Sequence, residues 1–222
     1  MRKSNNNLQK TLFAEPPSNC NLCDRLEKFR KINKKTWPTW HNGPVPSYGS
    51  IKAPLLIVGL APGLRGANRT GRPFTGDFAG DLLYKTLFKY NFSNNLYNKH
   101  PDDGLELFQC RISNGVRCLP PNNKPISEEI NNCRSFLVKE ISIMDNLKII
   151  LALGGIAHLT VVKSLERKPS DFKFAHGAMH CVKPNLILAN SYHCSRYNTN
   201  TGRLNTDMFE NVFQNIRNYI QL

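Results

Sequence analysis

The chain has 222 residues, and its hydrophobic fraction of 40% is sufficient for one globular domain with a full core. Thirty Lys and Arg against sixteen Asp and Glu leave a formal charge of +14, which favours a polyanionic partner, either nucleic acid or an anionic membrane surface. No apolar run approaches the ~20 residues that span a bilayer, and we expect no secretory signal because MRKSNNNLQK lacks an apolar stretch.

The first elements in chain order are a tail and a helix. Residues 1–18 are polar and end in two prolines, so we expect a flexible tail followed by a single domain over 19–222. Apolar residues recur at helical spacing from Leu22 to Ile32, which predicts a helix over Cys20–Lys35. A loop rich in Trp, Pro and Gly follows this helix.

Short apolar runs and longer helical segments then alternate along the chain. The predicted strands are Leu55–Gly59, Leu107–Ile112, Ile149–Leu153 and Leu186–Ala189. The predicted helices are Phe78–Tyr90, Ser127–Met144, Ile156–Leu165 and Asp207–Ile220. Buried strands that alternate with helices favour an α/β fold, a three-layer α/β/α sandwich around a central, mainly parallel four-stranded sheet.

Gly, Asn and His residues gather directly after the predicted strands. The segments that contain them are Gly59–Gly63, Ser113–Asn114, Gly154–Gly155 and Asn190–His193. Ligands of open α/β sheets bind beyond the carboxyl ends of the strands. The sequence therefore predicts a single site, assembled at one edge of the sheet from distant parts of the chain.

The seven cysteines favour metal or cluster ligation over disulfides, because we expect no export signal. Cys20 and Cys23 form a C-x2-C pair whose thiolates can share one centre, and Cys118 and Cys133 lie far downstream. Four thiolates suit zinc or a four-iron cluster. In the alternative interpretation Cys118 and Cys133 are ordinary buried cysteines. The spacing alone leaves these possibilities open.

Four segments of the sequence together resemble one protein family. They are GLAPG at 59–63, NRTGRPFTGD at 68–77, RCLPP at 117–121 and SYHCSRYNTNTGRL at 191–204. In their order and spacing they resemble the family 5 (type b) uracil-DNA glycosylases. The resemblance implies an enzyme that flips uracil, and other deaminated bases such as hypoxanthine, out of DNA. Such an enzyme hydrolyses the N-glycosidic bond and leaves an abasic site, the first step of base excision repair.

The same resemblance implies a cofactor, a partner and a location. It implies a [4Fe–4S] cluster held by Cys20, Cys23, Cys118 and Cys133. The implied partner is double- or single-stranded DNA that contains uracil or another deaminated base, with no membrane association. We expect a monomer in the cytoplasm, associated with the nucleoid of a prokaryote.

Leu60 separates this chain from a neighbouring family. Family 4 has a carboxylate after the first Gly of the first motif, where this chain has Leu60. Leucine can neither polarise a water molecule nor stabilise a cation. Family 5 shares this gap, so we expect another residue to supply the catalytic acid and the substrate range to extend beyond uracil.

Cleavage of an N-glycosidic bond builds positive charge on the sugar and negative charge on the base, so a carboxylate and a base-directed donor are needed. We expect Asp77 to orient water or stabilise the sugar cation, His193 to donate to a base carbonyl, and Asn114 to pair with the uracil edge. Each has a structural alternative. Asp77 can cap a helix, His193 can fix its loop, and Asn114 can be a turn residue.

Further candidates for substrate binding accompany these three catalytic residues. They are Gly59, Leu60, Ala61, Pro62, Gly63, Phe74, Arg196 and Asn198. We expect Phe74 to stack on the flipped base and the loop from Cys194 to Arg203 to enter the minor groove. The rival interpretation is a non-catalytic iron–sulfur or zinc protein that binds nucleic acid.

Overall fold

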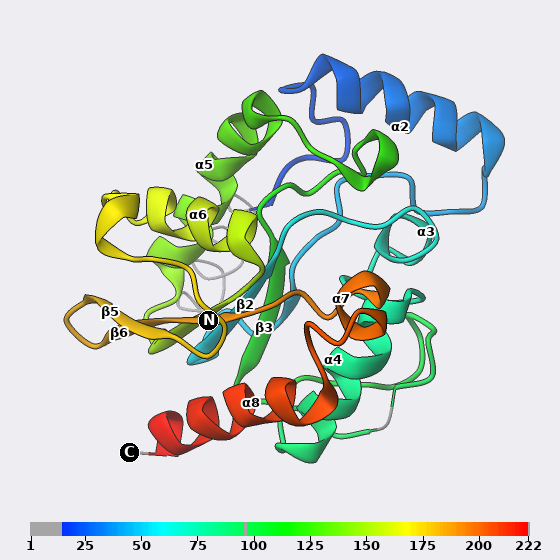
Figure 1. Ribbon diagram of the computed structural model, residues 1–222. Helices are drawn as coiled ribbons and strands as arrows, with labels where there is room; N and C mark the ends of the chain where they lie inside the picture. The colour runs from blue at the N-terminus through cyan, green and yellow to red at the C-terminus, as the bar shows by residue number, and fades with distance from the viewer. Residues whose placement is uncertain (1–14, 96, 222) are drawn as a thin grey trace, which may run out of the picture.

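The computed structural model describes residues 15–95 and 97–221 (Figure 1). The strands are β1 Tyr48–Gly49, β2 Leu55–Gly59, β3 Cys110–Asn114, β4 Ile149–Leu153, β5 Met179–Lys183 and β6 Leu186–Ser191. The helices are α2 Asp24–Thr36, α3 Ala67–Thr70, α4 Phe78–Lys89, α5 Ser127–Ile143, α6 Gly155–Ser164, α7 Arg196–Asn200 and α8 Thr206–Gln221. Short 3-10 turns lie at Pro121–Asn123 and Pro169–Asp171.

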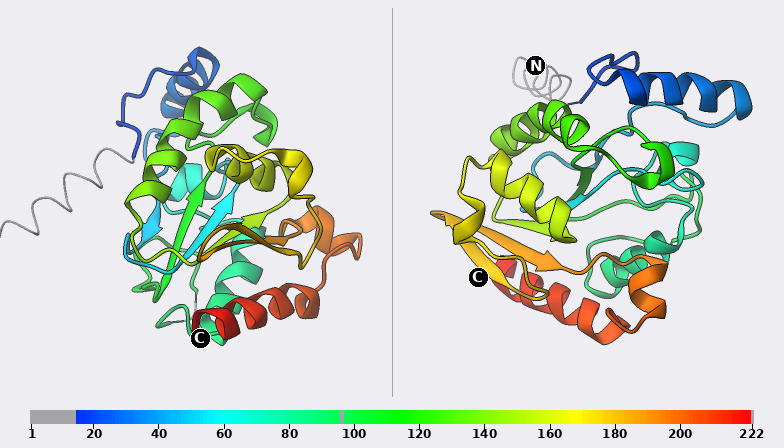
Figure 2. Two further views of the ribbon diagram at one scale, coloured as in Figure 1. Left: turned by 90° about the vertical axis from the view of Figure 1, so that its left-hand side faces the viewer. Right: turned by 45° about the horizontal axis from the view of Figure 1, so that its top comes forward.

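The sheet is the middle layer of a three-layer α/β/α sandwich. Successive side chains of a strand point to opposite faces, so Leu55 and Ile57 pack into one apolar cluster and Leu56 and Val58 into another. Helices α4 and α8 cover the first face and helices α5 and α6 cover the second (Figures 1 and 2). The predicted fold class is thereby confirmed.

The sheet has six strands in the order β1-β3-β2-β4-β6-β5, so the prediction of four strands was wrong. The four predicted strands form its parallel centre, and β1 and β5 add antiparallel edges. An edge strand needs no continuous apolar run. β1 has two residues, and in β5 only Val182 is buried.

Two predicted boundaries also differ from the structure. The strand predicted over Leu107–Ile112 begins only at Cys110, because Gln109 has a φ of 53° and Phe108 is exposed. The first helix begins after Cys23, with Leu22 and Ile32 in solvent. Its inward face instead carries Leu26, Arg30 and Asn33, so the apolar spacing identified the helix but not its buried face.

The predicted tail over 1–18 falls mostly on residues 1–14, which lie outside the described residues. Glu15 is described, and its carboxylate pairs with Arg111 at 3.0 Å and with Arg117 at 2.8 Å. The structure thus ties the chain to the sheet from Glu15 onward. Over the described ranges, none of the helices combines the length and the apolar character needed to cross a membrane.

Candidate functional site

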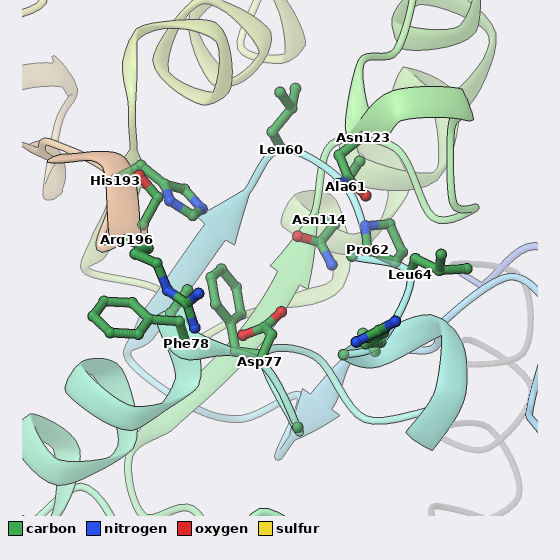
Figure 3. Close-up of a pocket in the computed structure, with 18 residues that line it drawn as sticks. Leu60, Ala61, Pro62, Leu64, Asp77, Phe78, Asn114, Asn123, His193 and Arg196 are labelled. Carbon is green, nitrogen blue, oxygen red and sulfur yellow. The ribbon is translucent and has the colours of Figure 1, made fainter. Parts of the chain in front are cut away.

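A cavity of about 750 Å³ lies at the carboxyl edge of the sheet (Figure 3). Its walls come from the loop after β2, the segment that leads into α4, the end of β3 and the loop after β6. This is the edge at which the sequence predicted a site. Parallel strands β2, β3, β4 and β6 direct their following loops to this edge, which is why distant motifs meet there.

Most of the predicted site residues line this cavity together. They are Leu60, Ala61, Pro62, Gly63, Phe74, Asp77, Asn114, His193 and Arg196. Gly59 and Asn198 are not among the lining residues that the structure describes. Lining residues that the sequence did not single out are Leu64, Arg65, Gly66, Ala67, Gly76, Phe78, Ala79, Asn123 and Ser195.

Asp77 is both a helix cap and a cavity residue. Its Oδ1 accepts a hydrogen bond from the Gly80 backbone N–H at 3.1 Å, which caps α4. Its Oδ2 faces Gly66, where a β-carbon would lie only 2.3 Å away. Burial, with the nearby charge of Asp81 as a smaller cause, raises the Asp77 pKa. The two functions suggested for Asp77 are therefore geometrically compatible, because they use different oxygens.

Gly59 acts by giving room to two of its neighbours. A β-carbon at this position would lie 2.5 Å from Asn114 Oδ1 and 2.7 Å from Phe74 Cζ. The Asn114 side chain is almost fully buried at the end of β3, and the Phe74 ring stacks on the His193 ring with centroids 5.9 Å apart. Replacing Gly59 would therefore displace two cavity residues.

The Phe74–Asp77 turn has an unusual backbone that needs support. Phe74 has a φ of 54° and Gly76 a φ of 89°, and the first is costly for a side chain with a β-carbon. The Tyr97 hydroxyl accepts from the Gly76 N–H at 2.6 Å and reaches the Phe74 carbonyl at 3.3 Å. The Tyr84 hydroxyl donates to the Pro73 carbonyl at 2.6 Å.

A buried arginine completes this support. Arg72 binds both oxygens of Asp103 at 2.8 and 2.9 Å and donates to Thr75 Oγ1 at 2.8 Å. Its guanidinium also lies 5.3 to 6.0 Å from the ring centroids of three tyrosines, which are Tyr48, Tyr84 and Tyr97. Bidentate pairing and cation–π contacts fix the turn that presents Asp77.

His193 is presented to the cavity as a neutral imidazole. Burial lowers its pKa to about 4, so one ring nitrogen carries a proton and the other does not at neutral pH. Asn198 lies behind it, where its amide donates to the His193 carbonyl at 2.8 Å. Asn198 thus holds the loop that carries His193.

The side chains in the cavity face one another from different walls. Figure 3 shows the Asp77 carboxylate, the Asn114 amide and the His193 ring around a common space. Leu60 points away from Asp77 at the far rim. The arrangement can receive a planar heterocycle with polar edges, and it offers a carboxylate on one side and hydrogen-bonding groups on another.

Aromatic and basic side chains lie on α7 and in the segments around it, beside the cavity. The Arg196 guanidinium lies 5.1 Å from the Phe78 ring centroid, which holds Arg196 beside the opening. Tyr197 is 71% exposed, more than any other large hydrophobic residue described. Arg203 lies 4.6 Å from the Tyr192 ring centroid. Of these side chains, Arg196 and Phe78 line the cavity.

The four predicted ligand cysteines line a second, smaller pocket. Cys20 and Cys23 precede α2, Cys118 follows β3, and Cys133 lies on α5. They share this pocket with Leu26, Arg30, Val116 and Phe136, among others. The structure thus brings together four thiols from three separate parts of the chain.

Hydrogen-bond donors point at two of these sulfurs. Arg30 donates to Cys118 Sγ at 3.0 Å, and the Arg117 backbone N–H donates to Cys133 Sγ at 3.3 Å. Burial raises the pKa of Cys118 and raises that of Cys133 to about 12, and the nearby arginines oppose this. Over the described residues, no group of three or more His, Cys, Asp or Glu side chains is arranged to hold a single metal ion. The donors to sulfur are suited to thiolates.

The family model and the relatives that match this chain point to the same protein family. Residues 46–217 match the family model described as "Uracil DNA glycosylase superfamily". A type-5 uracil-DNA glycosylase of Thermus thermophilus is 37% identical over 92% of this chain and 95% of its own length. One from Pyrobaculum aerophilum is 38% identical, over 91% and 89%. A type-4 uracil-DNA glycosylase of Sulfurisphaera tokodaii is 30% identical, over 85% and 84%.

Proposed function

The chain belongs to the uracil DNA glycosylase superfamily and excises uracil from DNA, and we propose that Asp77, His193 and Asn114 carry the reaction. In the overall reaction a water oxygen bonds to the sugar C1′ and the bond between C1′ and the base breaks. The electron pair of that bond leaves with the base, which ends protonated. The DNA keeps an abasic site, from which base excision repair continues.

Asp77 is the group that faces the sugar in this proposal. Its Oδ1 caps α4 and its Oδ2 lies beside Gly66 of the cavity wall, so the cap fixes the side chain while using only one of its two oxygens. A buried carboxylate stabilises the positive charge that develops on the sugar more strongly than an exposed one, and it can orient the attacking water. The single observation that carries this assignment is the second oxygen, Oδ2, which does not accept the Gly80 cap bond and lies beside Gly63 and Gly66 of the cavity wall.

His193 and Asn114 serve the base. A neutral imidazole donates one hydrogen bond to a base carbonyl, and this bond strengthens as negative charge develops on the departing base. The Asn114 amide offers a donor and an acceptor to the O4 and N3–H edge of uracil. Phe74 stacks on the base plane beside His193. Because all of these groups come from one chain, we propose that the monomer is active.

Tyr197 is the proposed wedge that fills the space of the flipped nucleotide. It is 71% exposed on α7, and its neighbour Arg196, which lines the cavity, is held on the Phe78 ring. An aromatic side chain inserted from the minor groove replaces the stacking that the flipped base leaves behind. Unstacking costs least at a mismatch, so uracil opposite guanine is the preferred substrate.

A wider substrate range is part of the proposal, and Leu60 supports it. The side chain on this rim of the cavity is apolar and turned away from Asp77, so it makes no specific polar demand on the base. Release of free base from uracil, hypoxanthine and xanthine duplexes tests this. We expect release from all three, fastest from uracil opposite guanine. Release from uracil duplexes alone would restrict the enzyme to uracil.

We also propose that Cys20, Cys23, Cys118 and Cys133 hold a [4Fe–4S] cluster. The fit is supported by four thiols on one pocket and by the Arg30 and Arg117 donors to sulfur. The group would supply a structural cross-link, because hydrolysis needs no electrons. Iron and zinc content of anaerobically purified protein tests it. Four irons per chain and absorption in the visible range are expected, and one zinc in a colourless protein would contradict the cluster.

A further inference from the structure

The C-terminal end of α2 and the loop that follows it form a surface that the catalytic assignments leave unused. Trp37 and Trp40 stack on each other with ring centroids 4.6 Å apart and planes 7° apart. Both rings are partly exposed, and exposed Lys34 and Lys35 precede them in the last turn of α2. We call these four residues the Trp–Lys surface.

The Trp–Lys surface is rigid and is fixed to the wall of the catalytic cavity. The Asn42 amide donates to the Trp37 carbonyl at 2.7 Å and to the Trp40 carbonyl at 3.3 Å. Asn68 of α3 donates in turn to Asn42 Oδ1 at 2.9 Å. The His41 backbone N–H donates to the Arg69 carbonyl at 3.1 Å. The loop after α2 is therefore attached to α3, which directly follows the cavity loop.

Positive charge continues from this surface to the cavity mouth. Arg65 lines the cavity and Arg69 lies on α3, and both side chains are exposed. Among the described residues no carboxylate pairs with either arginine or with Lys34 and Lys35, whereas Lys31 on the same helix pairs with Glu27 at 2.6 Å. The acidic residues of α2 lie in its first turn, so its net positive charge lies at the end nearest α3 (Figure 1).

Given the proposed function, we propose that the Trp–Lys surface binds the DNA backbone on one side of the flipped nucleotide. A flipped base can enter the cavity only if duplex DNA lies across its mouth, between α7 and α3. The flanking strand then runs over Arg65 and Arg69 toward Lys34 and Lys35, where the ammonium groups contact phosphates. The paired indoles pack against the sugars of that strand, as aromatic side chains do in basic nucleic-acid grooves.

The chain provides its own probe for this contact. Trp37 and Trp40 are its two tryptophans. Tryptophan fluorescence therefore reports on this surface alone. The titrant is a duplex with an abasic site, which binds without turnover, in one long form and in two forms each shortened on one side of the site. We expect the long duplex and one shortened form to change the fluorescence, and the other shortened form to bind with no change.

The matched variants are Lys34→Ala/Lys35→Ala and the control Lys163→Ala/Lys183→Ala, whose lysines are exposed on α6 and β5 at the opposite side of the molecule. The Lys34→Ala/Lys35→Ala variant lacks two charges that neutralise phosphates. Its slope of log KM against log salt on the long duplex should therefore be shallower than that of the wild type by about 2. Its kcat, and its KM on the duplex shortened on that side, should match the wild type. The control should match it throughout.

Two results would overturn the proposal while leaving the glycosylase activity intact. One is fluorescence that does not change when the long duplex saturates an enzyme that still releases uracil. The other is a salt dependence that is the same for both lysine pairs. If the wild type released no base, the proposed function itself would be refuted. Failure of the proposed DNA contact can therefore be told apart from failure of the proposed function.

Discussion

At the scale of single residues, the catalytic function proposed for Asp77 and the stability of the fold make opposite demands on its charge. Its carboxylate is partly buried and desolvation raises its pKa, so ionisation near neutral pH costs the folded state stability. Asn caps a helix as well as Asp does. We therefore expect Asp77→Asn to melt at the same temperature as wild type or higher at pH 7, with any gain vanishing below the ordinary Asp pKa. Asp77→Ala, which removes the cap, should lose about 1 kcal/mol.

The pH dependence of base release follows from the pKa shifts of Asp77 and His193. In the proposed reaction Asp77 must be ionised, and its pKa is raised, so the rate should fall as the pH drops through a value above the ordinary 3.8. His193 stays neutral down to about pH 4, so it does not limit the rate near neutrality. The check is the single-turnover rate against pH, with folding followed by circular dichroism. A rate that stays flat through this range in folded protein would contradict the assignment.

Tyr97 is the residue most easily overlooked in the site. Its hydroxyl accepts from the Gly76 N–H, next to Asp77, and removing it leaves that N–H without its partner. We expect Tyr97→Phe to lower kcat about 10-fold with KM little changed, because the carboxylate moves while the DNA contacts remain. Tyr219→Phe on α8 is the control and should match wild type. Equal kcat values in the two variants would show that Tyr97 does not position Asp77.

At the scale of elements, sequence patterns were reliable where burial was uniform. β2 and β4 begin and end where predicted, because central parallel strands are apolar along their whole length. β1 and β5 escaped prediction because edge strands carry mixed residues. Helix α2 turns Arg30 inward to a sulfur, which no apolar periodicity can indicate.

The residues of the site also divide into those that sequence patterns can indicate and those that only the fold brings in. Motif residues such as Asp77, Asn114 and His193 could be found because each follows a predicted strand or precedes a predicted helix. Tyr97 and Asp103 could not, because they lie in an irregular segment and reach the Phe74–Asp77 turn only through the fold. Asn198, which we expected to bind substrate, is not among the described lining residues, and its amide donates to the His193 carbonyl instead.

The cysteine pocket joins three elements, so its loss should act on the fold before it acts on chemistry. We expect Cys133→Ser to lose iron and to lower the melting temperature, because α5 would no longer be tied to α2 and to the segment after β3. Cys181→Ser, on the exposed edge strand, is the control and should keep both. Full iron content and wild-type melting in Cys133→Ser would exclude it as a ligand.

At the scale of the whole molecule, the charge of +14 predicts strongly salt-dependent DNA binding. If about five phosphates are neutralised, a plot of log K against log salt should have a slope of roughly −4 to −5. The measurement is the affinity for an abasic duplex over a range of salt concentrations. A slope near zero would mean that the positive charge is not used for DNA.

In the proposed reaction, this cavity hydrolyses the bond between uracil and its sugar through Asp77. The most direct test is single-turnover release of free uracil from a U·G duplex by wild type, Asp77→Asn and His193→Ala. We predict rapid release by wild type and losses of roughly 100-fold or more in each variant, with duplex binding retained. Release by Asp77→Asn at the wild-type rate would contradict the account, because Asp77 would then be only a helix cap.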